Sequence, residues 1–440
     1  MHGLTLALMV LAGSTGWQPE PPKPQPAPPA KDQPRPPARQ PARDALGWPM
    51  LPASPQVKRV EATPAEKVKV DDRTIDQAVK RSVDLLLSMQ EGLENSEWPY
   101  EGVYRVGGQI PVGYRVGGTA IVAMSLLEAP GYAEDGRRKA AVERAAKFVC
   151  GAIEHPLMSP DTYQGGYDVR VWGHIYGLHL LVEMKKRGAI PKTLAEPAER
   201  AIAYYLQGLK KLEIAPGTPG GWNYASEKTP APFVTGPALM ALFAARAQGY
   251  AVDDGLVVRG LESLERSRGA QGTVVYSGAA AARTGQGDSV PGAMGRMCVT
   301  ESTLLLAGRG SVDRVRNAVD KFIEHWAEFD KRRTMTGTHV PPYMVAPYYF
   351  MYGHRYAALA VELLPEAERA GYRERLNRLM FSVRSEDGSW TDRVFKRTAN
   401  FGTAFALHAL LAPAVGRPAG WAPPKAPADA PAPGNNGAKG

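Results

Sequence analysis

Several glycines are spaced at similar intervals along the chain, and polar residues follow some of them closely. Arg296 and His354 directly follow two such glycines, with Glu301 and Tyr356 a few residues further on. A cationic side chain can neutralise a substrate carboxylate, and a histidine or a tyrosine can move a proton. We therefore predict that these four residues form the catalytic group, if the protein is an enzyme.

The position after the glycine is polar in other parts of the chain as well, at Thr119, His174 and Thr403. If these residues lie in the first turns of helices, free N–H groups and the positive ends of helix dipoles would face a shared space. We expect all three to line a ligand cavity, together with Asp168 and with Trp222 from an aromatic turn.

These positions belong to six copies of one sequence unit. Each copy has an apolar-periodic helix, a turn and a second helix that starts with glycine. The turn has glycine and an aromatic residue except in the fifth copy, which is irregular. The second helices are predicted to begin at Gly118, Gly173, Gly236, Gly295, Gly353 and Gly402. The preceding helices are predicted over 75–90, 140–154, 198–212, 256–266, 315–329 and 372–383. The chain is therefore expected to be all-α, with about twelve helices.

Six helical hairpins of one handedness can stack openly or close into a ring, and a closed ring needs no polar capping repeats. We predict the closed form, an (α/α)6 toroid with the glycine-started helices inside. His179 and His408, six residues after their glycines, are interpreted as interior histidines rather than catalysts. Cys298 is interpreted as a small core residue.

Two turns carry a family resemblance. The stretches Gln90-Glu-Gly-Leu-Glu-Asn-Ser-Glu-Trp98 and Glu386-Asp-Gly-Ser-Trp390, with the Gly-Thr-Ala starts that follow them, resemble the prenyltransferase and squalene-cyclase repeat. That repeat builds the toroids of terpenoid cyclases and of protein prenyltransferase β subunits. The resemblance covers residues 74–412. It implies a double ring of helices around a cavity for a hydrophobic or isoprenoid ligand.

The chain departs from this family where the family's chemistry would lie. Alkene-protonating cyclases have an Asp-rich motif before the position of Thr119, where this chain has Arg115-Val-Gly-Gly. Prenyltransferases bind zinc through Asp-x-Cys and a histidine, and Cys298 and His354 resemble two of these ligands. Arg296 stands at the aspartate position and would repel the metal. We therefore expect neither zinc nor another cofactor, with Cys298 and His354 the partial match to a metal site.

Three functions are compatible with this sequence. The first is binding of a hydrophobic or isoprenoid ligand, or of a protein partner, in the central cavity without cyclase chemistry. The second is a polysaccharide lyase or another carbohydrate-active (α/α)6 enzyme. A lyase would use Arg296, His354 and Tyr356 on a uronate, and a glycosidase would use Asp168 and Glu301 as its two carboxylates. The third is an interaction scaffold of the cell envelope. An enzyme of this kind would be cyclase-like, prenyltransferase-like or lyase-like.

The two ends of the chain differ from its centre. Residues 1–17 have an apolar stretch followed by small residues, as in a secretory signal peptide, and are too short to span a bilayer. Residues 18–65 and 413–440 are rich in proline and are expected to be disordered on either side of a toroid over 66–412. We expect an exported protein, periplasmic or extracellular, without a transmembrane span. Its proline-rich arms could tether it to the cell envelope.

The formal net charge is +9. Much of this excess lies in the proline-rich ends, and no basic stripe of the kind that binds nucleic acids is evident in the centre. The expected ligand is therefore a hydrophobic small molecule or a glycan, and not a nucleic acid.

Overall fold

The computed structural model describes residues 42–44, 47–102, 104–214, 220–225, 228–280, 285–333, 335, 337–339, 341–392 and 394–421. The predicted signal peptide, most of the predicted proline-rich linker and the tail from residue 422 lie outside the described residues. The fold below is that of the unit that begins at Ala42.

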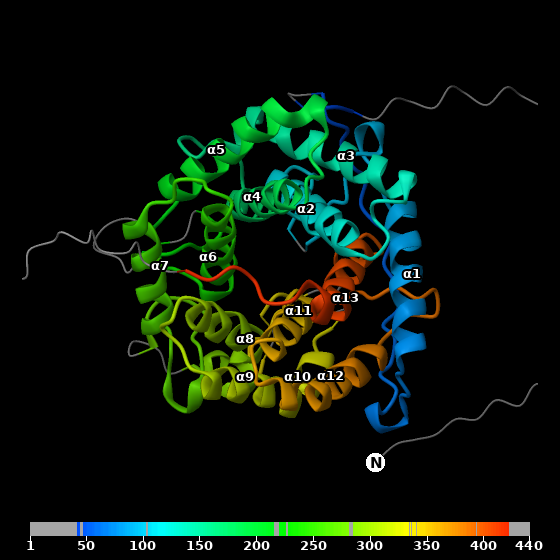
Figure 1. Ribbon diagram of the computed structural model, residues 1–440, viewed down its shortest axis with the longest axis vertical. Helices are drawn as coiled ribbons and strands as arrows, with labels where there is room; N and C mark the ends of the chain where they lie inside the picture. The colour runs from blue at the N-terminus through cyan, green and yellow to red at the C-terminus, as the bar shows by residue number, and fades with distance from the viewer. Residues whose placement is uncertain are drawn as a thin grey trace, which may run out of the picture. The chain divides into compact units, whose positions relative to one another are not determined.

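Thirteen α-helices in the described part of the chain form two concentric rings (Figure 1). The inner helices are α2 (Val112–Glu128), α4 (Arg170–Lys186), α6 (Pro232–Ala247), α8 (Val290–Leu306), α11 (Tyr349–Val361) and α13 (Thr398–Val415). The outer helices are α1 (Asp72–Ser88), α3 (Gly136–Gly151), α5 (Ala195–Lys211), α7 (Asp254–Arg266), α9 (Val312–Glu324), α10 (Trp326–Asp330) and α12 (Glu366–Phe381). The outer element of the fifth pair is split at His325 into α9 and α10.

The inner helices close on themselves. Each inner helix contacts the next along the chain, and the last, α13, contacts the first, α2. Outer helices such as α9 have an apolar stripe that packs inward, whereas α2 and α13 are apolar on all sides and almost completely buried. The predicted (α/α)6 toroid of six helical pairs is confirmed.

The inner helices begin earlier than predicted, from three to six residues before the repeated glycine. The glycine is needed for close packing rather than for starting the helix. A Cβ atom at Gly118 would lie 2.5 Å from the backbone nitrogen of Tyr100, and one at Gly402 would lie 2.4 Å from the carbonyl oxygen of Trp390. The turn between the paired helices therefore rests directly on the inner helix.

The tryptophans of these turns join the paired helices in copies one, three and six. In each copy a threonine hydroxyl accepts a hydrogen bond from the tryptophan backbone N–H, and the indole N–H donates to a carbonyl in the last turns of the outer helix. The three sets are Thr119, Trp98 and Leu86; Thr235, Trp222 and Leu209; and Thr403, Trp390 and Met380. Thr119, Thr403 and Trp222 are fully buried in the wall of the ring.

The described end of the predicted linker packs against the ring. Trp48 is only 9 % exposed, and the guanidinium of Arg115 lies 4.8 Å from the centre of its ring. The backbone N–H of Val57 donates to the carbonyl oxygen of Val394. The ordered unit therefore begins before residue 66.

One described helix, α13, is long and apolar enough to cross a membrane by length and composition alone. It is an inner helix of the ring, and 78 % of its apolar window is buried within the protein.

Candidate functional site

The axis of the ring is closed by aromatic side chains toward the N-terminal ends of the inner helices. The ring centre of Trp172 on α4 lies 6.5 Å from that of Tyr352 on α11, and 6.3 Å from that of Phe401 on α13. Phe405 packs against Phe401 at 4.5 Å. Because α4 and α11 belong to opposite pairs of the ring, these contacts cross the axis. We call these four residues the aromatic floor.

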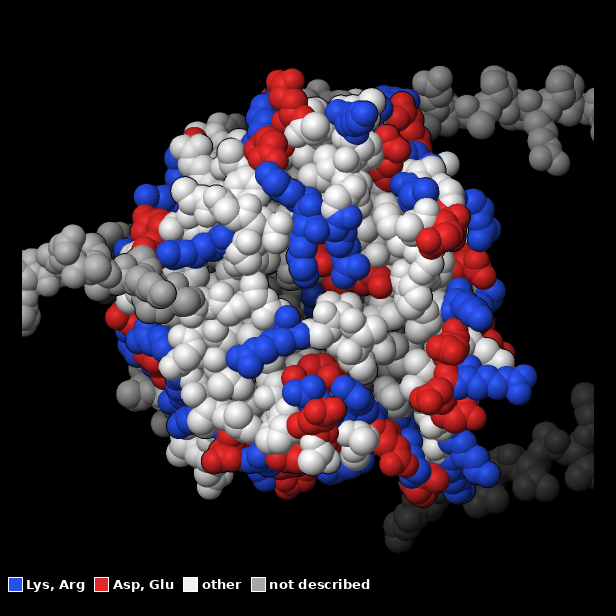
Figure 2. All heavy atoms as spheres, in the orientation of Figure 1, with Lys and Arg blue, Asp and Glu red and all other residues white. Residues whose placement is uncertain are grey.

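Toward the C-terminal ends of the same helices the axis opens into a cavity of about 320 Å³. Figure 2 shows a hollow at the centre of this face, bordered by Lys and Arg side chains. The cavity is lined by Glu128 from α2; His179, Val182, Glu183 and Lys186 from α4; Met240, Ala244 and Ala247 from α6; Arg355, Tyr356 and Leu359 from α11; His408, Ala412 and Val415 from α13; and Gln248 and residues 416–419 from connecting segments.

Arg355 is the most unusual of these residues. It is only 9 % exposed, its Nη1 atom is buried without a hydrogen-bond partner, and no ion pair to its guanidinium is formed by another described residue. The group lies 5.6 and 5.5 Å from the ring centres of Tyr356 and Phe405. Negative ends of helix dipoles at this face favour its charge, but they leave its N–H donors without acceptors. A buried donor without a partner costs roughly 1–3 kcal/mol, and more when it is charged.

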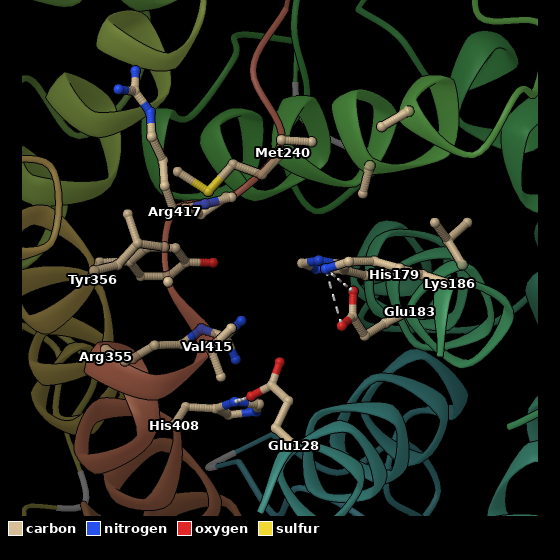
Figure 3. Close-up of a pocket in the computed structure, with 18 of the residues that line it drawn as sticks. Glu128, His179, Glu183, Lys186, Met240, Arg355, Tyr356, His408, Val415 and Arg417 are labelled. Atoms are coloured by element: carbon tan, nitrogen blue, oxygen red, sulfur yellow. Dashed lines mark hydrogen bonds and ion pairs between the residues drawn. The ribbon is translucent and has the colours of Figure 1, made fainter. Parts of the chain in front are cut away.

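His179 and Tyr356 face each other across the cavity from α4 and α11 (Figure 3). Burial and the charge of Arg355 lower the pKa of His179 to about 3, so its imidazole is neutral near pH 7. Burial raises the pKa of the Tyr356 phenol. A neutral imidazole and a protonated phenol therefore lie on opposite sides of one space.

Glu128 and His408 form an ion pair at the edge of the cavity, with 2.6 Å between Oε2 and Nδ1. Burial by itself would raise the pKa of Glu128. The charges of His408 and Arg355 have the larger effect, and the pKa is lowered to about 2. The other ring nitrogen of His408 lies 3.1 Å from the carbonyl oxygen of Ile121. Burial lowers the pKa of His408, yet both nitrogens face acceptors, which requires a proton on each. We therefore assign a charged pair.

A second carboxylate, Glu183, lies at the rim. It accepts hydrogen bonds from Arg187 Nε at 2.7 Å and from Lys186 Nζ at 3.2 Å. With Arg355 and the Glu128–His408 pair, these groups give the cavity and its rim an excess of positive charge. The site therefore favours an anionic ligand.

Residues 416–421 form a segment that we call the strap, and its residues 416–419 make one wall of the cavity. The chain leaves α13 at Gly416, whose φ of 77° is in the left-handed region that favours glycine. Trp421 is 7 % exposed, packs 5.6 Å from Phe243 on α6 and lies 4.1 Å beneath the guanidinium of Arg246. The strap thus runs from the sixth pair to the third, on the opposite side of the ring (Figure 1).

Of the four predicted catalytic residues, Tyr356 lines this cavity and the other three do not. The Arg296 guanidinium donates hydrogen bonds to the carbonyl oxygens of Val274, Gly292 and Gly287, each at 2.7 Å. Its donors hold the first turn of α8 and the segments before it. It is 2 % exposed, and it has a structural position in the wall of the ring.

His354 and Glu301 are also committed to internal contacts. The Nδ1 atom of His354 donates to the carbonyl oxygen of Phe350 at 2.8 Å, and Nε2 accepts from the indole of Trp326 at 2.9 Å. Glu301 accepts hydrogen bonds from Arg268, with Nε at 2.9 Å. The structure therefore does not bring Arg296, His354, Glu301 and Tyr356 together in one accessible site.

The five residues predicted to bind a ligand are outside this cavity. Thr119, Thr403 and Trp222 have the structural roles described above. His174 is fully buried, and its Nε2 donates a hydrogen bond to the carbonyl oxygen of Met158 at 2.9 Å. Asp168 is 3 % exposed and accepts a hydrogen bond at the start of α4 from the backbone of Arg170. Thr119, His174 and Thr403 lie in the wall because the position after the glycine packs against turns and outer helices rather than facing the axis. Asp168 and Trp222 lie in the turns before α4 and α6.

Cys298 and His354, the two residues that resemble zinc ligands, are not available to bind a metal ion. Burial raises the pKa of the Cys298 thiol, which is 1 % exposed, and both ring nitrogens of His354 are occupied. Within the described ranges, no group of three or more His, Cys, Asp or Glu side chains could hold a metal ion.

The cavity residues had a sequence signal at other repeat positions. His179 and His408, interpreted as interior histidines, lie six residues after their glycines, and both reach the cavity. Glu128 and Glu183 lie ten residues after Gly118 and Gly173, near the ends of α2 and α4. Polar residues late in α2, α4 and α13 therefore mark part of the site. Arg355, two residues after Gly353, was not among the predicted site residues, because one arginine inside an apolar helix gives no such signal.

Comparisons with known proteins support the fold. No protein-family model and no curated protein matches the chain. A solved structure of unsaturated glucuronyl hydrolase from Streptococcus agalactiae superposes with a TM-score of 0.50 at 11 % identity, over 81 % of this chain and 97 % of that one. An α-1,6-mannanase from Salegentibacter sp. HEL1_6 gives a TM-score of 0.49 at 10 % identity, over 76 % and 100 %. The chain is similar in fold to α/α toroids, and membership of the prenyltransferase and cyclase family is not shown.

Proposed function

We propose that the protein is a carbohydrate-active toroid that binds an acidic sugar in its axial cavity and cleaves the glycan by elimination, as a lyase. The observation that carries this proposal is Arg355, a buried guanidinium without a hydrogen-bond partner among the described residues, at the wall of the axial cavity. Arginine pairs well with a carboxylate because two parallel N–H groups match its two oxygens.

The lining favours a sugar over the isoprenoid ligand that the repeat resemblance implies. A cavity for an isoprenoid would be an apolar aromatic tube along the axis. In this ring the aromatic side chains meet and fill the axis, and the open half presents charged, imidazole and phenol groups. A sugar offers the acceptors and donors that such groups need. The envelope-scaffold interpretation gives no role to these inward-facing groups.

Hydrolysis by two carboxylates fits this cavity less well. A glycoside hydrolase needs one carboxylic acid that holds a proton near neutral pH and gives it to the leaving oxygen. Glu128 has a pKa of about 2 and is bound to His408. Glu183 accepts hydrogen bonds from two cations, Lys186 and Arg187. Neither carboxylate is suited to donate a proton.

Elimination uses the groups that remain. Arg355 binds the uronate carboxylate and stabilises the charge that develops on it when the neighbouring C5 proton is removed. His179 accepts that proton, the C4–O bond breaks, a C4=C5 double bond forms, and Tyr356 donates a proton to the departing oxygen. A bound carboxylate offsets the Arg355 charge, which is one cause of the low pKa of His179, and so makes the imidazole a stronger base.

The similar toroid with a TM-score of 0.50 is a glucuronyl hydrolase, a protein whose name refers to an acidic sugar. This agrees with the proposed class of ligand. At 11 % identity the likeness concerns the fold, so the proposal rests on the cavity.

The first experiment is incubation of the full chain with acidic and neutral polysaccharides, with ultraviolet detection of unsaturated uronate ends. We expect product from an acidic substrate, and a loss of about 100-fold in kcat/KM for Arg355→Met, because a preorganised donor to the developing charge is removed. Arg375→Met is the control: it removes an arginine whose side chain is 54 % exposed on α12, and it should leave the rate unchanged.

Two results would argue against this assignment. If acidic glycans were neither bound nor cleaved, the carbohydrate function would fail. If Arg355→Met retained full activity on the substrate found, the role of Arg355 would be wrong even though the protein acted on a glycan.

A further inference from the structure

The axial cavity has only one open end. The aromatic floor closes the ring on the side of the inner-helix N-termini, where Trp172, Tyr352 and Phe401 meet across the axis. The Tyr352 hydroxyl also donates to the carbonyl oxygen of Phe233 at 2.7 Å, which ties α11 to α6 below the cavity. A glycan chain therefore cannot pass along the axis and leave on the other side.

The strap restricts the open end. It starts beside His408 and Val415 on α13, contributes Gly416 to Ala419 to the lining, and ends at the buried Trp421 between α6 and α8. The backbone N–H of Trp421 donates to the carbonyl oxygen of Leu306 at 3.0 Å. Both ends of the strap are thus fixed to inner helices, and it narrows the mouth from one side.

The volume sets a size limit. A cavity of about 320 Å³ is at the small end of ligand pockets, which begin near ~300 Å³, and has room for about one or two sugar rings. Three groups would contact a sugar: Arg355, His179 and Tyr356. All three line this cavity rather than a surface groove.

We infer that the cavity is a blind pocket that accepts the end of an acidic saccharide chain, closed beneath by the aromatic floor and limited at its mouth by the strap. This inference rests on the proposed function, and it adds that the protein acts from a chain end and does not bind internal segments. Long chains enter only by their terminal sugars.

The test is a binding series with oligogalacturonates from monomer to hexamer, measured by calorimetry and native mass spectrometry with the full-length Tyr356→Phe variant to prevent turnover. We expect the affinity per chain to rise from monomer to dimer and then to stay constant, with one protein per chain at every length. Binding to internal segments would instead give more protein per chain, and rising affinity, as the chain lengthens.

The strap is tested with Trp421→Ala in the same background. Loss of the indole removes the contacts with Phe243 and Arg246, so the mouth widens and the trimer and longer chains should bind several-fold more tightly than the dimer. Tyr372→Ala, which removes an aromatic side chain from outer helix α12, should keep the length profile of the parent.

The outcomes separate this inference from the function it rests on. If no oligogalacturonate of any length binds while acidic glycans of other kinds also fail, the proposed function is wrong. If chains bind but the number of proteins per chain grows with length, the function stands and the blind pocket is wrong. An unchanged length profile in Trp421→Ala overturns the strap as a wall of the pocket.

Discussion

Buried histidines in this ring have different roles that depend on their hydrogen-bond partners. His354 has one nitrogen on a carbonyl oxygen and the other on an indole N–H, so it is held as the neutral form. His408 has acceptors on both nitrogens and is held as the charged form. His179 faces the cavity and is free to bind a ligand. The residue type predicts none of these roles by itself.

The neutral histidines make stability dependent on pH. Burial lowers the pKa of both His174 and His354 to about 4. The unfolded chain, with a histidine pKa of ~6.5, therefore binds more protons below that pH than the folded chain does. Stability should fall as the pH decreases from about 6.5 to about 4, by up to ~3 kcal/mol for each histidine.

This pH dependence can be measured by denaturant unfolding of the wild type and of the His174→Gln, His354→Gln double variant. The variant should be less stable at neutral pH, because it loses packing and hydrogen bonds, but its stability should change less between pH ~6.5 and ~4. An equally steep decline in the variant would show that other groups cause the acid sensitivity.

The first and sixth helical pairs depend on the close approach of the turn to the inner helix. The glycine within α13 allows this approach, since a Cβ atom on Gly402 would lie 2.4 Å from the carbonyl oxygen of Trp390. The indole of the same tryptophan bonds the last turn of α12 at Met380. The glycine and the tryptophan thus fix the distance between α12 and α13.

Gly402→Ala should destabilise the protein by about 1–3 kcal/mol, because the added methyl group meets backbone and forces a shift. Gly371→Ala is the matched control: Gly371 lies in outer helix α12, and a Cβ atom there meets nothing within 4 Å. That change should stabilise the protein by ~0.5–1 kcal/mol through helix propensity. Thermal unfolding measures the stability of both variants. An equal loss of stability in both would show that close packing at Gly402 is not the cause.

The ring as a whole is closed by contacts between its first and last pairs. Arg397, next to the start of α13, donates to Glu91 at 2.6 Å and also to Glu101, both near the turn of the first pair. Its backbone N–H donates to the hydroxyl of Ser54 at 2.8 Å. The N-terminal segment therefore takes part in holding the two ends of the ring together.

Arg397→Met should lower the free energy of unfolding by about 1–3 kcal/mol, because Glu101, whose side chain is 2 % exposed, would lose one of its two cations and keep only Arg105. Arg375→Met on the outer surface should change it by less than ~1 kcal/mol. Chemical denaturation compares the two. Loss of similar size in both variants would mean that Arg397 does not contribute specially to closure.

The architecture follows from the amino-acid pattern alone. The spaced glycines and the apolar helical periodicity repeat in all six copies, and the aromatic turns in five, so that the local pattern alone favours paired helices joined by close turns. The sequence also named Tyr356, His179 and His408 among positions of interest, although it placed the helix starts too late by three to six residues. That error moved the expected cavity toward Arg296, His174 and Thr119.

Only the tertiary structure decided which end of the axis is open. Several inner helices, such as α2 and α13, carry polar residues both early and late, and the pattern along one helix does not show where side chains from opposite helices meet. Trp172, Tyr352 and Phe401 fill the axis at one end, and smaller residues such as Ala244 and Ala412 leave space at the other. Arg355 faces that space without a hydrogen-bond partner. This depends on the packing of five helices that are distant in the chain.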